Sequence, residues 1–279
     1  MSISQLDAAP ILVLGGNGKT GARVVQRLRA MSLDVRACSR STEPRFDWND
    51  RTTWQAALDG IQRVYVTYQP DLAVPGAVDS VSAFFDQALT SGAKHIVLLS
   101  GRGEEEAQAA EQALQASGAQ WTILRCSWFM QNFSESFLRD PVLDGALALP
   151  ASNIKEPFVD AEDIADVAVA ALTQAGHTNR LYELTGPRAL SFAEAAECMA
   201  RATQREIRFE SVPPDAFRAG LLEAGVPAPE VSLIMYLFTT VLDGRNAQPM
   251  NGVRDALQRE PRTFEDYVAR CVADGVWTP

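Results

Sequence analysis

Glycines gathered in one stretch near the N-terminus constrain the fold of this chain more than any other feature. The apolar run Ile11–Leu14 leads into Gly15-Gly16-Asn17-Gly18-Lys19-Thr20-Gly21, and a helical apolar pattern follows at once in Val24, Val25, Leu28 and Met31. Glycines between a strand and a helix let the backbone turn tightly and approach a pyrophosphate, which then binds the free N–H groups of the helix N-terminus. The stretch therefore predicts a dinucleotide-binding turn; the alternative is a glycine-rich turn without a ligand. A nucleotide-triphosphate P-loop is disfavoured, because such a loop needs a glycine five residues before Gly18, and this chain has Val13 at that position.

Charge and cysteine usage narrow the class of protein. A formal net charge of −10 argues against a nucleic-acid partner, because phosphate contacts need clustered Lys and Arg. No apolar run approaches the roughly 20 residues that span a bilayer, and the first ten residues do not read as a secretory signal. The cysteines (Cys38, Cys126, Cys198 and Cys271) form no CxxC pair, and only two histidines are present, which disfavours a metal site. We expect a cytoplasmic protein with reduced thiols and no metal.

The first part of the chain alternates strand-like and helix-like segments, which is typical of a parallel sheet covered by helices on both faces. Strands are predicted near 11–15, 34–38, 62–67, 95–100 and 121–125. Helices are predicted near 19–31, 51–58, 77–91 and 104–117. A further helix around 164–172 and a strand at 181–185 follow. This pattern predicts an α/β fold, a Rossmann-like doubly wound parallel sheet.

Beyond residue 187 the pattern changes to a smaller, mostly helical substrate lobe. Ser191 with Glu194 and Thr263 with Asp266 have the spacing of capping boxes, each opening a helix. A short strand at 207–212 and an apolar segment at 231–242 lie between them. We therefore expect an NADP-binding Rossmann domain over 1–140, completed by about 159–188, and a substrate lobe over 141–158 and 189–279.

The end of the second strand selects between NAD and NADP. An acid there would bind the ribose 2′-hydroxyl, whereas an arginine would pair with a 2′-phosphate. No acid follows Asp34, and the strand leads into Ser39-Arg40-Ser41. The planar guanidinium of Arg40 and the flanking hydroxyls can bind a phosphate dianion, so we expect NADP(H); the alternative for Arg40 is a solvated surface position.

A catalytic pair that is common in this architecture is missing from the sequence. In a Tyr-x-x-x-Lys pair the lysine lowers the tyrosine pKa, so that the phenol can protonate an alkoxide. The tyrosines (Tyr65, Tyr68, Tyr182, Tyr236 and Tyr267) are followed four residues later by Gln69, Leu72, Gly186, Thr240 and Cys271. Carbonyl reduction by that route is excluded. Sugar-nucleotide isomerases and epimerases of this fold rely on the same pair and are disfavoured with it.

Several motifs together resemble the NmrA-like branch of the atypical short-chain dehydrogenases over nearly the whole chain. They are the glycine stretch 15–21, Ser39-Arg40-Ser41, the segments 121–125 and 128–133, the segment 157–165, and Leu184-Thr185-Gly186-Pro187. Within that branch, Phe46-Asp47-Trp48 and the late apolar segment are most similar to the ergot-alkaloid reductases of the agroclavine dehydrogenase type. Triarylmethane-dye and quinone reductases are more distant relatives.

The resemblance implies an NADP(H)-binding domain whose substrate lobe closes over the nicotinamide. By position, Asp47 and Trp48 would lie beside the adenine, and Tyr68-Gln69-Pro70 would pass near the ribose and nicotinamide. Ser100 ends a predicted strand where related folds place a site serine; a satisfied strand-end hydroxyl is its alternative. The predicted cofactor residues are Gly15, Gly16, Asn17, Gly18, Lys19, Thr20, Ser39, Arg40, Asp47, Trp48, Tyr68, Gln69, Pro70 and Ser100. The family has a proline where this chain has Cys126, for which we expect a small buried side chain.

Apolar and aromatic residues are the candidates for a substrate pocket. Its predicted walls are Trp128, Phe129, Met130, Phe133, Met235, Tyr236 and Phe238, with a core position as the alternative for each. A site without a Tyr/Lys pair suits an iminium, a quinone or an aryl-stabilised cation, because these small aromatic or conjugated acceptors already carry the electron demand. The acidic run Glu104–Glu106 is interpreted as a solvated helix start.

Two classes of function remain at this stage. The favoured one is an NADPH-dependent reductase of a conjugated or cationic organic acceptor, for which no catalytic residue can be named. The alternative is a non-catalytic NADP(H)-binding redox sensor that regulates a protein partner. An exposed apolar face of the substrate lobe would serve either as a homodimer surface or as a lid.

Overall fold

The protein divides into two compact units. The computed structural model describes residues 9–278. Unit 1 runs up to Cys126 and also contains Ala161–Leu184 and Asn251–Arg259. Unit 2 consists of Ser127–Asp160, Thr185–Met250 and the chain from Glu260 onward. The sequence boundaries placed residues 127–140 in the Rossmann domain and residues 251–259 in the substrate lobe. In the structure, residues 127–140 make their contacts within unit 2, and residues 251–259 make theirs within unit 1.

Unit 1 is built on a six-stranded sheet in which every pair of neighbours is parallel. Its strands are β1 (Ile11–Leu14), β2 (Val35–Cys38), β3 (Arg63–Val66), β4 (His95–Gly101), β5 (Gln120–Cys126) and β8 (Arg180–Leu184), in the order β2-β1-β3-β4-β5-β8. The chain goes to one side of β1 to form β2 and to the other to form β3. A reversal of this kind marks where open parallel sheets bind ligands, beyond the carboxyl ends of the strands. The predicted α/β class is confirmed.

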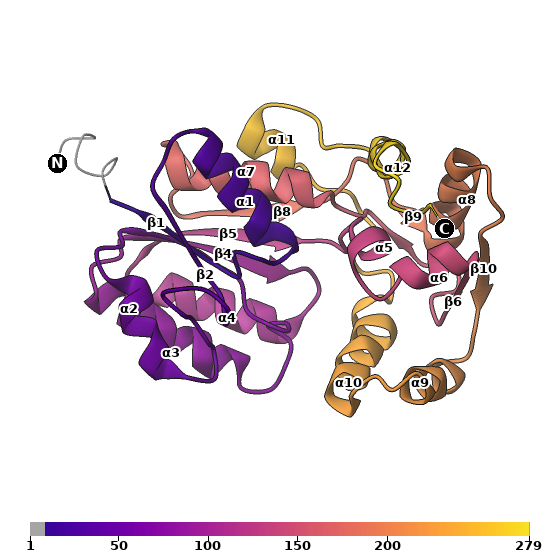
Figure 1. Cartoon of the computed structure of the whole chain (residues 1–279), viewed down its shortest axis with the longest axis horizontal. Coiled ribbons are helices and arrows are strands. Elements are labelled where there is room, and N and C mark those ends of the chain that lie inside the picture. The colour runs from indigo at the N-terminus through magenta and orange to yellow at the C-terminus, as the bar shows by residue number, and fades with distance from the viewer. Residues whose placement is uncertain (1–8, 279) are drawn as a thin grey trace. The chain divides into compact units, whose positions relative to one another are not determined.

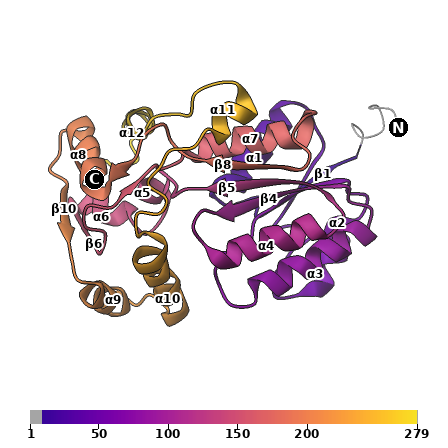
Figure 2. The same ribbon diagram turned by 180° about the vertical axis from the view of Figure 1, so that it is seen from behind.

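Helices cover both faces of this sheet (Figures 1 and 2). On one face lie α1 (Lys19–Ala30), α7 (Ala161–Thr173) and α11 (Gly252–Leu257). The other face carries α2 (Trp54–Leu58), which follows a 3₁₀ turn at Arg51–Thr53, together with α3 (Ala77–Thr90) and α4 (Glu105–Ala116). Helix α1 buries Val24, Val25 and Leu28 on one side, as its periodicity predicts. Every helix predicted for the first part of the chain is present.

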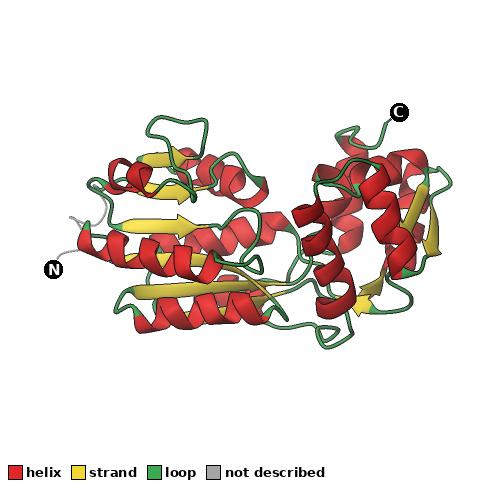
Figure 3. Ribbon diagram, turned by 90° about the horizontal axis from the view of Figure 1, so that it is seen from below, coloured by secondary structure: helices red, strands yellow, loops and turns green. Residues whose placement is uncertain are grey.

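Unit 2 is mostly helical (Figure 3). Its elements are α5 (Asn132–Glu135), α6 (Arg139–Asp144), β6 (Ala146–Leu149), β7 (Lys155–Glu156), β9 (Leu190–Ser191), α8 (Phe192–Thr203), β10 (Arg208–Ser211), α9 (Pro214–Glu223), α10 (Ala228–Tyr236), a π-helical turn (Leu237–Val241) and α12 (Phe264–Ala273). Strands β6 and β10 pair in parallel, whereas β7 and β9 are antiparallel. Both predicted capping boxes are confirmed, at the starts of α8 and α12.

The core of unit 2 is rich in aromatic rings. Phe133 contacts Phe158, Phe192 and Phe264, with ring centroids 5.5 to 5.9 Å apart. Edge-to-face and tilted arrangements of this kind stabilise a core beyond the area that the rings bury. Within residues 9–278, no helix combines the length and the apolar character needed to cross a membrane.

Candidate functional site

The glycine stretch forms the turn between β1 and α1 and packs tightly against its surroundings. Gly15 has a positive φ of +65°, a conformation that side chains disfavour. A Cβ atom on Gly21 would lie 2.2 Å from the carbonyl oxygen of Gly15, so the first turn of α1 sits directly on the loop. The turn therefore has the close backbone packing that a dinucleotide-binding loop requires.

The N-terminus of α1 is open to a ligand. Gly18 is its N-cap residue, and no side chain caps the helix there. Asn17 and Gly18 are exposed, Lys19 is half-buried, and Thr20 is buried. Uncapped N–H groups at a helix N-terminus favour an anion, so this end of α1 fits a pyrophosphate.

The glycine loop and the end of β2 meet through side chains. Asn17 Nδ2 donates to Ser39 Oγ at 3.1 Å and lies 3.4 Å from Ser41 Oγ, and the two hydroxyl oxygens are 3.2 Å apart. Arg40 lies between the two serines and is exposed. The structure thus brings together residues that the sequence assigned to two separate parts of a cofactor site.

A cluster of aromatic rings stands beside this loop. Trp48 Nε1 donates to the carbonyl oxygen of Thr67 at 3.1 Å, and the Trp48 ring lies 4.9 Å from that of Tyr68. The backbone N–H of Asn49 and the guanidinium of Arg45 lower the pKa of the intervening Asp47. The cluster connects the end of β3 to the segment after β2. Gln69 and Pro70, which follow Tyr68, are exposed.

Ser100 faces the protein interior. Its hydroxyl donates to Glu111 Oε1 at 2.6 Å, and the same oxygen accepts from Arg125 Nε at 2.9 Å. The hydrogen bond that Arg125 donates to Glu111 also raises the pKa of Arg125. Ser100 therefore has the alternative arrangement, in which the strand-end hydroxyl is hydrogen-bonded within the protein. Cys126 closes β5 as a buried thiol, and burial raises its pKa.

Glu104 departs from its sequence interpretation. The run Glu104–Glu106 was expected to be solvated, yet Glu104 is only 8% exposed, whereas Glu105 is exposed. Burial and the neighbouring carboxyl group of Asp71, in the loop after β3, raise the pKa of Glu104 well above its usual range. Helix-dipole reasoning favours an exposed acid at this position, and the tertiary contact overrides it.

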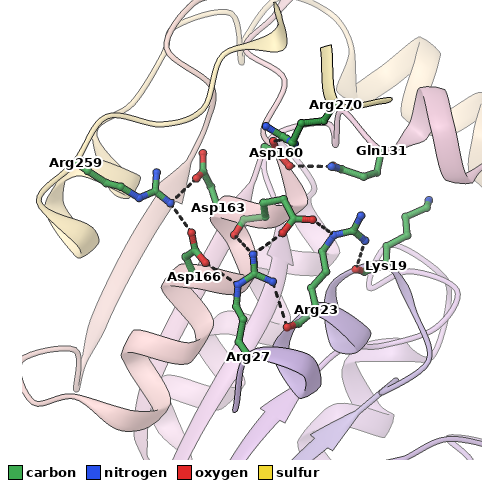
Figure 4. A network of polar contacts seen from close by, with 10 residues as sticks. Lys19, Arg23, Arg27, Gln131, Asp160, Asp163, Asp166, Arg259 and Arg270 are labelled. Atoms are coloured by element: carbon green, nitrogen blue, oxygen red, sulfur yellow. Dashed lines mark hydrogen bonds and ion pairs between the residues drawn. The ribbon is translucent and has the colours of Figure 1, made fainter. Parts of the chain in front are cut away.

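An ionic network, also missed by the sequence analysis, anchors α1 to α7 (Figure 4). Glu162 Oε1 lies 2.6 Å from Arg23 Nε, and Arg27 pairs with both Glu162 and Asp166. These two acids raise the pKa of Arg27 against the opposing effect of burial. Arg259, just after α11, lies 2.7 Å from Asp163 Oδ1 and 2.6 Å from Asp166 Oδ2. The helix that carries the glycine loop is thus held to its neighbour by charge-assisted hydrogen bonds.

The predicted pocket residues, all in unit 2, differ in exposure. Met130, Phe133, Met235 and Phe238 are buried, and Phe133 has no exposed surface. Trp128, Phe129 and Tyr236 are half-buried, and the Trp128 ring packs edge-on against Phe238 at 4.9 Å. Met130, Phe133 and Phe238 belong to the core of unit 2. The half-buried ones keep surface that a ligand can contact.

The motif at 157–160 is also a packed element. Phe129 and Val159 form a parallel bridge, and the fully buried Asp160 accepts from Gln131 Nε2 at 2.8 Å and pairs with Arg270. Among residues 9–278, no group of three or more His, Cys, Asp or Glu side chains is arranged to hold a metal ion.

Solved structures share the fold. The triphenylmethane reductase of Citrobacter sp., determined with NADP(H), matches with a TM-score of 0.79 and 20% identity, over 94% of this chain and 99% of that one. The Escherichia coli NADPH-dependent quinone oxidoreductase QOR2, determined with NADPH, matches with a TM-score of 0.81 and 18% identity over the same shares. At these identities the likeness establishes the Rossmann-like fold.

Sequence relatives cover nearly the full chain. Agroclavine dehydrogenase of Claviceps fusiformis is 32% identical over 277 residues, 93% of this chain and 96% of the relative. An NAD(P)H azoreductase of Xenophilus azovorans is 30% identical over 280 residues, 92% and 96% of the two chains. The resemblance inferred from the motifs is confirmed. The model of the NmrA-like family matches residues 7–268, and this chain therefore belongs to the NmrA-like family.

Proposed function

We propose that this protein is an NADPH-dependent reductase that transfers hydride to a conjugated or cationic organic acceptor. The names of its relatives support the class, since one is a dehydrogenase and another an NAD(P)H azoreductase. The cluster formed by Asn17, Ser39 and Ser41 around the exposed Arg40 carries the proposal. It offers an amide, two hydroxyls and a guanidinium at the end of β2, where an NAD-selective site would have an acid.

The described residues fit a dinucleotide at the carboxyl ends of β1, β2 and β3. The uncapped N-terminus of α1 would bind the pyrophosphate, and the Ser39–Ser41 segment would bind the 2′-phosphate. Asp47 and Trp48 would lie beside the adenine, with Tyr68, Gln69 and Pro70 near the ribose and nicotinamide. When bound, NADPH supplies the hydride.

The proposed acceptor class follows from the side chains available. The sequence contains no Tyr-x-x-x-Lys pair, and the hydroxyl of Ser100 is committed to Glu111. An iminium, a quinone or an aryl-stabilised cation needs no positioned acid for hydride transfer, because solvent can supply any proton. The half-buried Trp128, Phe129 and Tyr236 would contact such a flat acceptor.

Steady-state NADPH oxidation tests this proposal directly. Purified protein is assayed against a panel of quinones, triarylmethane dyes and cyclic iminium compounds, with NADH in parallel. We expect turnover that favours NADPH. Tight NADPH binding without turnover on any acceptor would contradict the reductase and favour the redox-sensor alternative.

The substitution Arg40→Ala tests the cofactor preference. Loss of a charge-assisted hydrogen bond to a 2′-phosphate should raise the KM for NADPH about ten- to hundredfold and leave that for NADH unchanged. Arg29→Ala, which removes an exposed arginine at the far end of α1, is the matched control. An unchanged NADPH/NADH preference in Arg40→Ala would show that this segment does not select the cofactor.

A further inference from the structure

A one-turn helix in unit 2 takes a hydrogen-bond donor from a distant part of the chain. Helix α5 spans only Asn132–Glu135, and Ser136, which follows it, has an extended backbone. The last carbonyl groups of a helix have no partner within that helix, and they make up all of so short an element. The carbonyl oxygen of Phe133 accepts from the indole Nε1–H of Trp277 at 2.9 Å. Trp277 thus supplies a donor that α5 cannot supply for itself.

The end of α12 directs Trp277 to this carbonyl. Gly275, just after the helix, has a φ of +69°, and the N–H of Val276 donates to the carbonyl oxygen of Cys271 at 2.9 Å. This is the hydrogen bond of a Schellman motif, which turns the chain back at the end of a helix. Arg205 then donates to the carbonyl oxygen of Trp277 at 3.0 Å, and the Trp277 side chain is buried. The indole is therefore fixed through both its backbone and its ring.

The segment that Trp277 holds at Phe133 begins at the proposed acceptor wall, Trp128 and Phe129. Its beginning is fixed to Val159 by two backbone hydrogen bonds. The N–H of Val159 donates to the carbonyl oxygen of Trp128 at 2.8 Å, and the N–H of Met130 donates to that of Val159 at 2.9 Å. The N–H of Phe133 donates in turn to the carbonyl oxygen of Met130 at 3.1 Å. A displacement at Phe133 is therefore passed to the wall within a few residues.

The last helix of the chain also reaches the middle of this segment (Figure 4). Gln131 Nε2 donates to Asp160 Oδ1 at 2.8 Å, and Arg270 of α12 pairs with the other oxygen of the same carboxylate. Asp160 is fully buried, which strengthens both contacts. Helix α12 and the residues that follow it thus hold the wall segment at two points.

We propose that Trp277 is a positioning residue for the acceptor, because its indole N–H fixes α5 and, through α5, the wall formed by Trp128 and Phe129. Trp277 is only 3% exposed, so it acts without touching the acceptor. This inference rests on the proposed reductase function. The proposed cofactor residues all belong to unit 1, whereas Trp277 and the wall belong to unit 2. Binding of NADPH should therefore not depend on Trp277.

The substitution Trp277→Phe tests this role. It keeps an aromatic ring in the core and removes the N–H that Phe133 uses. With a naphthoquinone and a cationic triarylmethane dye as probes, the KM for the acceptor at saturating NADPH should rise about tenfold, the value of one buried hydrogen bond. The Kd for NADPH should stay at the wild-type value. An unchanged KM for both acceptors would overturn the proposal.

Trp54→Phe is the matched control. Trp54 is also buried, and its indole N–H also donates to a backbone carbonyl oxygen at 2.9 Å, that of Asp47 in unit 1. This variant should keep the wild-type KM for the acceptor at saturating NADPH. An equal rise of that KM in Trp54→Phe and Trp277→Phe would assign the effect to general loosening and refute a positioning role.

A double-mutant cycle with Trp128→Leu gives a sharper test. If Trp277 acts through the wall, Trp277→Phe should add little to the loss of kcat/KM that Trp128→Leu causes alone. Full additivity of the two losses would contradict the proposal. If Trp277→Phe does not fold, Arg205→Gln replaces it. That variant releases the backbone of Trp277 and leaves its ring intact, and the KM for the acceptor should rise in the same way.

Amide hydrogen exchange of the ligand-free protein separates this contact from the reaction. In Trp277→Phe, the backbone N–H groups of Met130 and Phe133 should exchange about tenfold faster, whereas those of β1 should keep their wild-type rates. Unchanged exchange at Met130 and Phe133 would refute the role of the indole. If exchange is faster but the wild type reduces no acceptor, the proposed function fails, and the positioning of an acceptor by Trp277 fails with it.

Discussion

Replacing Gly21 by alanine should show how much the fold depends on contact between α1 and the glycine loop. The added Cβ atom would lie 2.2 Å from the carbonyl oxygen and 2.8 Å from the carbonyl carbon of Gly15. Both are backbone atoms, so no side-chain rotation can relieve the contact. Helix and loop must separate, or the loop must change conformation.

The expected size of the effect follows from two opposing terms. Overpacking against backbone costs about 3 kcal/mol, the upper end of the usual range. Alanine is a better helix former than glycine by about 1 kcal/mol, which leaves a net loss of about 2 kcal/mol in the free energy of unfolding. Gly220 in α9 is an exposed helical glycine with nothing within 4 Å of an added Cβ, so Gly220→Ala should instead gain about 1 kcal/mol.

Urea denaturation followed by far-UV circular dichroism compares the two variants. Their free energies of unfolding should differ by about 3 kcal/mol, with opposite signs relative to the wild type. We also expect Gly21→Ala to weaken NADPH binding, since the loop must move. Equal stability of the two variants would refute the argument that α1 rests directly on the glycine loop.

Two further substitutions test buried electrostatics. Arg259→Ala removes a guanidinium that is paired with Asp163 and Asp166. Because Asp163 has no exposed surface and Arg259 is 36% exposed, the free energy of unfolding should fall by about 2 kcal/mol. Thermal melts that show no loss of stability would contradict a stabilising role for this ion pair. Burial lowers the pKa of His95 from 6.5 to about 4. Between these pH values the folded state therefore binds fewer protons than the unfolded state. The free energy of unfolding should fall by up to about 3 kcal/mol as the pH drops through this window. The substitution His95→Gln can keep the hydrogen bond to Thr122, which is 2.9 Å long in the present protein. In urea titrations at several pH values, this variant should lose less stability at acidic pH than the wild type. If both proteins lose the same stability, groups other than His95 cause the acid dependence.

The sequence predicted those parts of the molecule that depend on neighbours along the chain. The strands, the helix after the glycine stretch and both capping boxes come from alternation, helical spacing and three-residue contacts, all of which are local. The proximity of Asn17 to Ser39 was also accessible, because β1 and β2 are adjacent parallel strands and their following loops share one edge of the sheet.

Burial could not be predicted in the same way. Phe133 and Phe129 have the same side chain within one short segment, yet one is fully buried and the other is half-buried. Glu104 follows every local rule for an exposed helix start, yet it is buried, and its carboxyl group lies over Gly101. Such outcomes depend on which loops face each other after the sheet has formed, and no short stretch of sequence contains that information.

The path of the chain makes the two units inseparable as gene fragments. The chain passes between them five times, after residues 126, 160, 184, 250 and 259. The segment Asn251–Arg259 returns to unit 1, where Gly252 lies so close to the backbone of Glu183 that a Cβ atom would come within 2.3 Å of its oxygen. A protein shortened before residue 251 would lose part of unit 1 although most of unit 2 precedes that point. Exchange of substrate specificity between relatives should therefore proceed by substitution within the continuous chain, because no single crossover can transplant one unit intact.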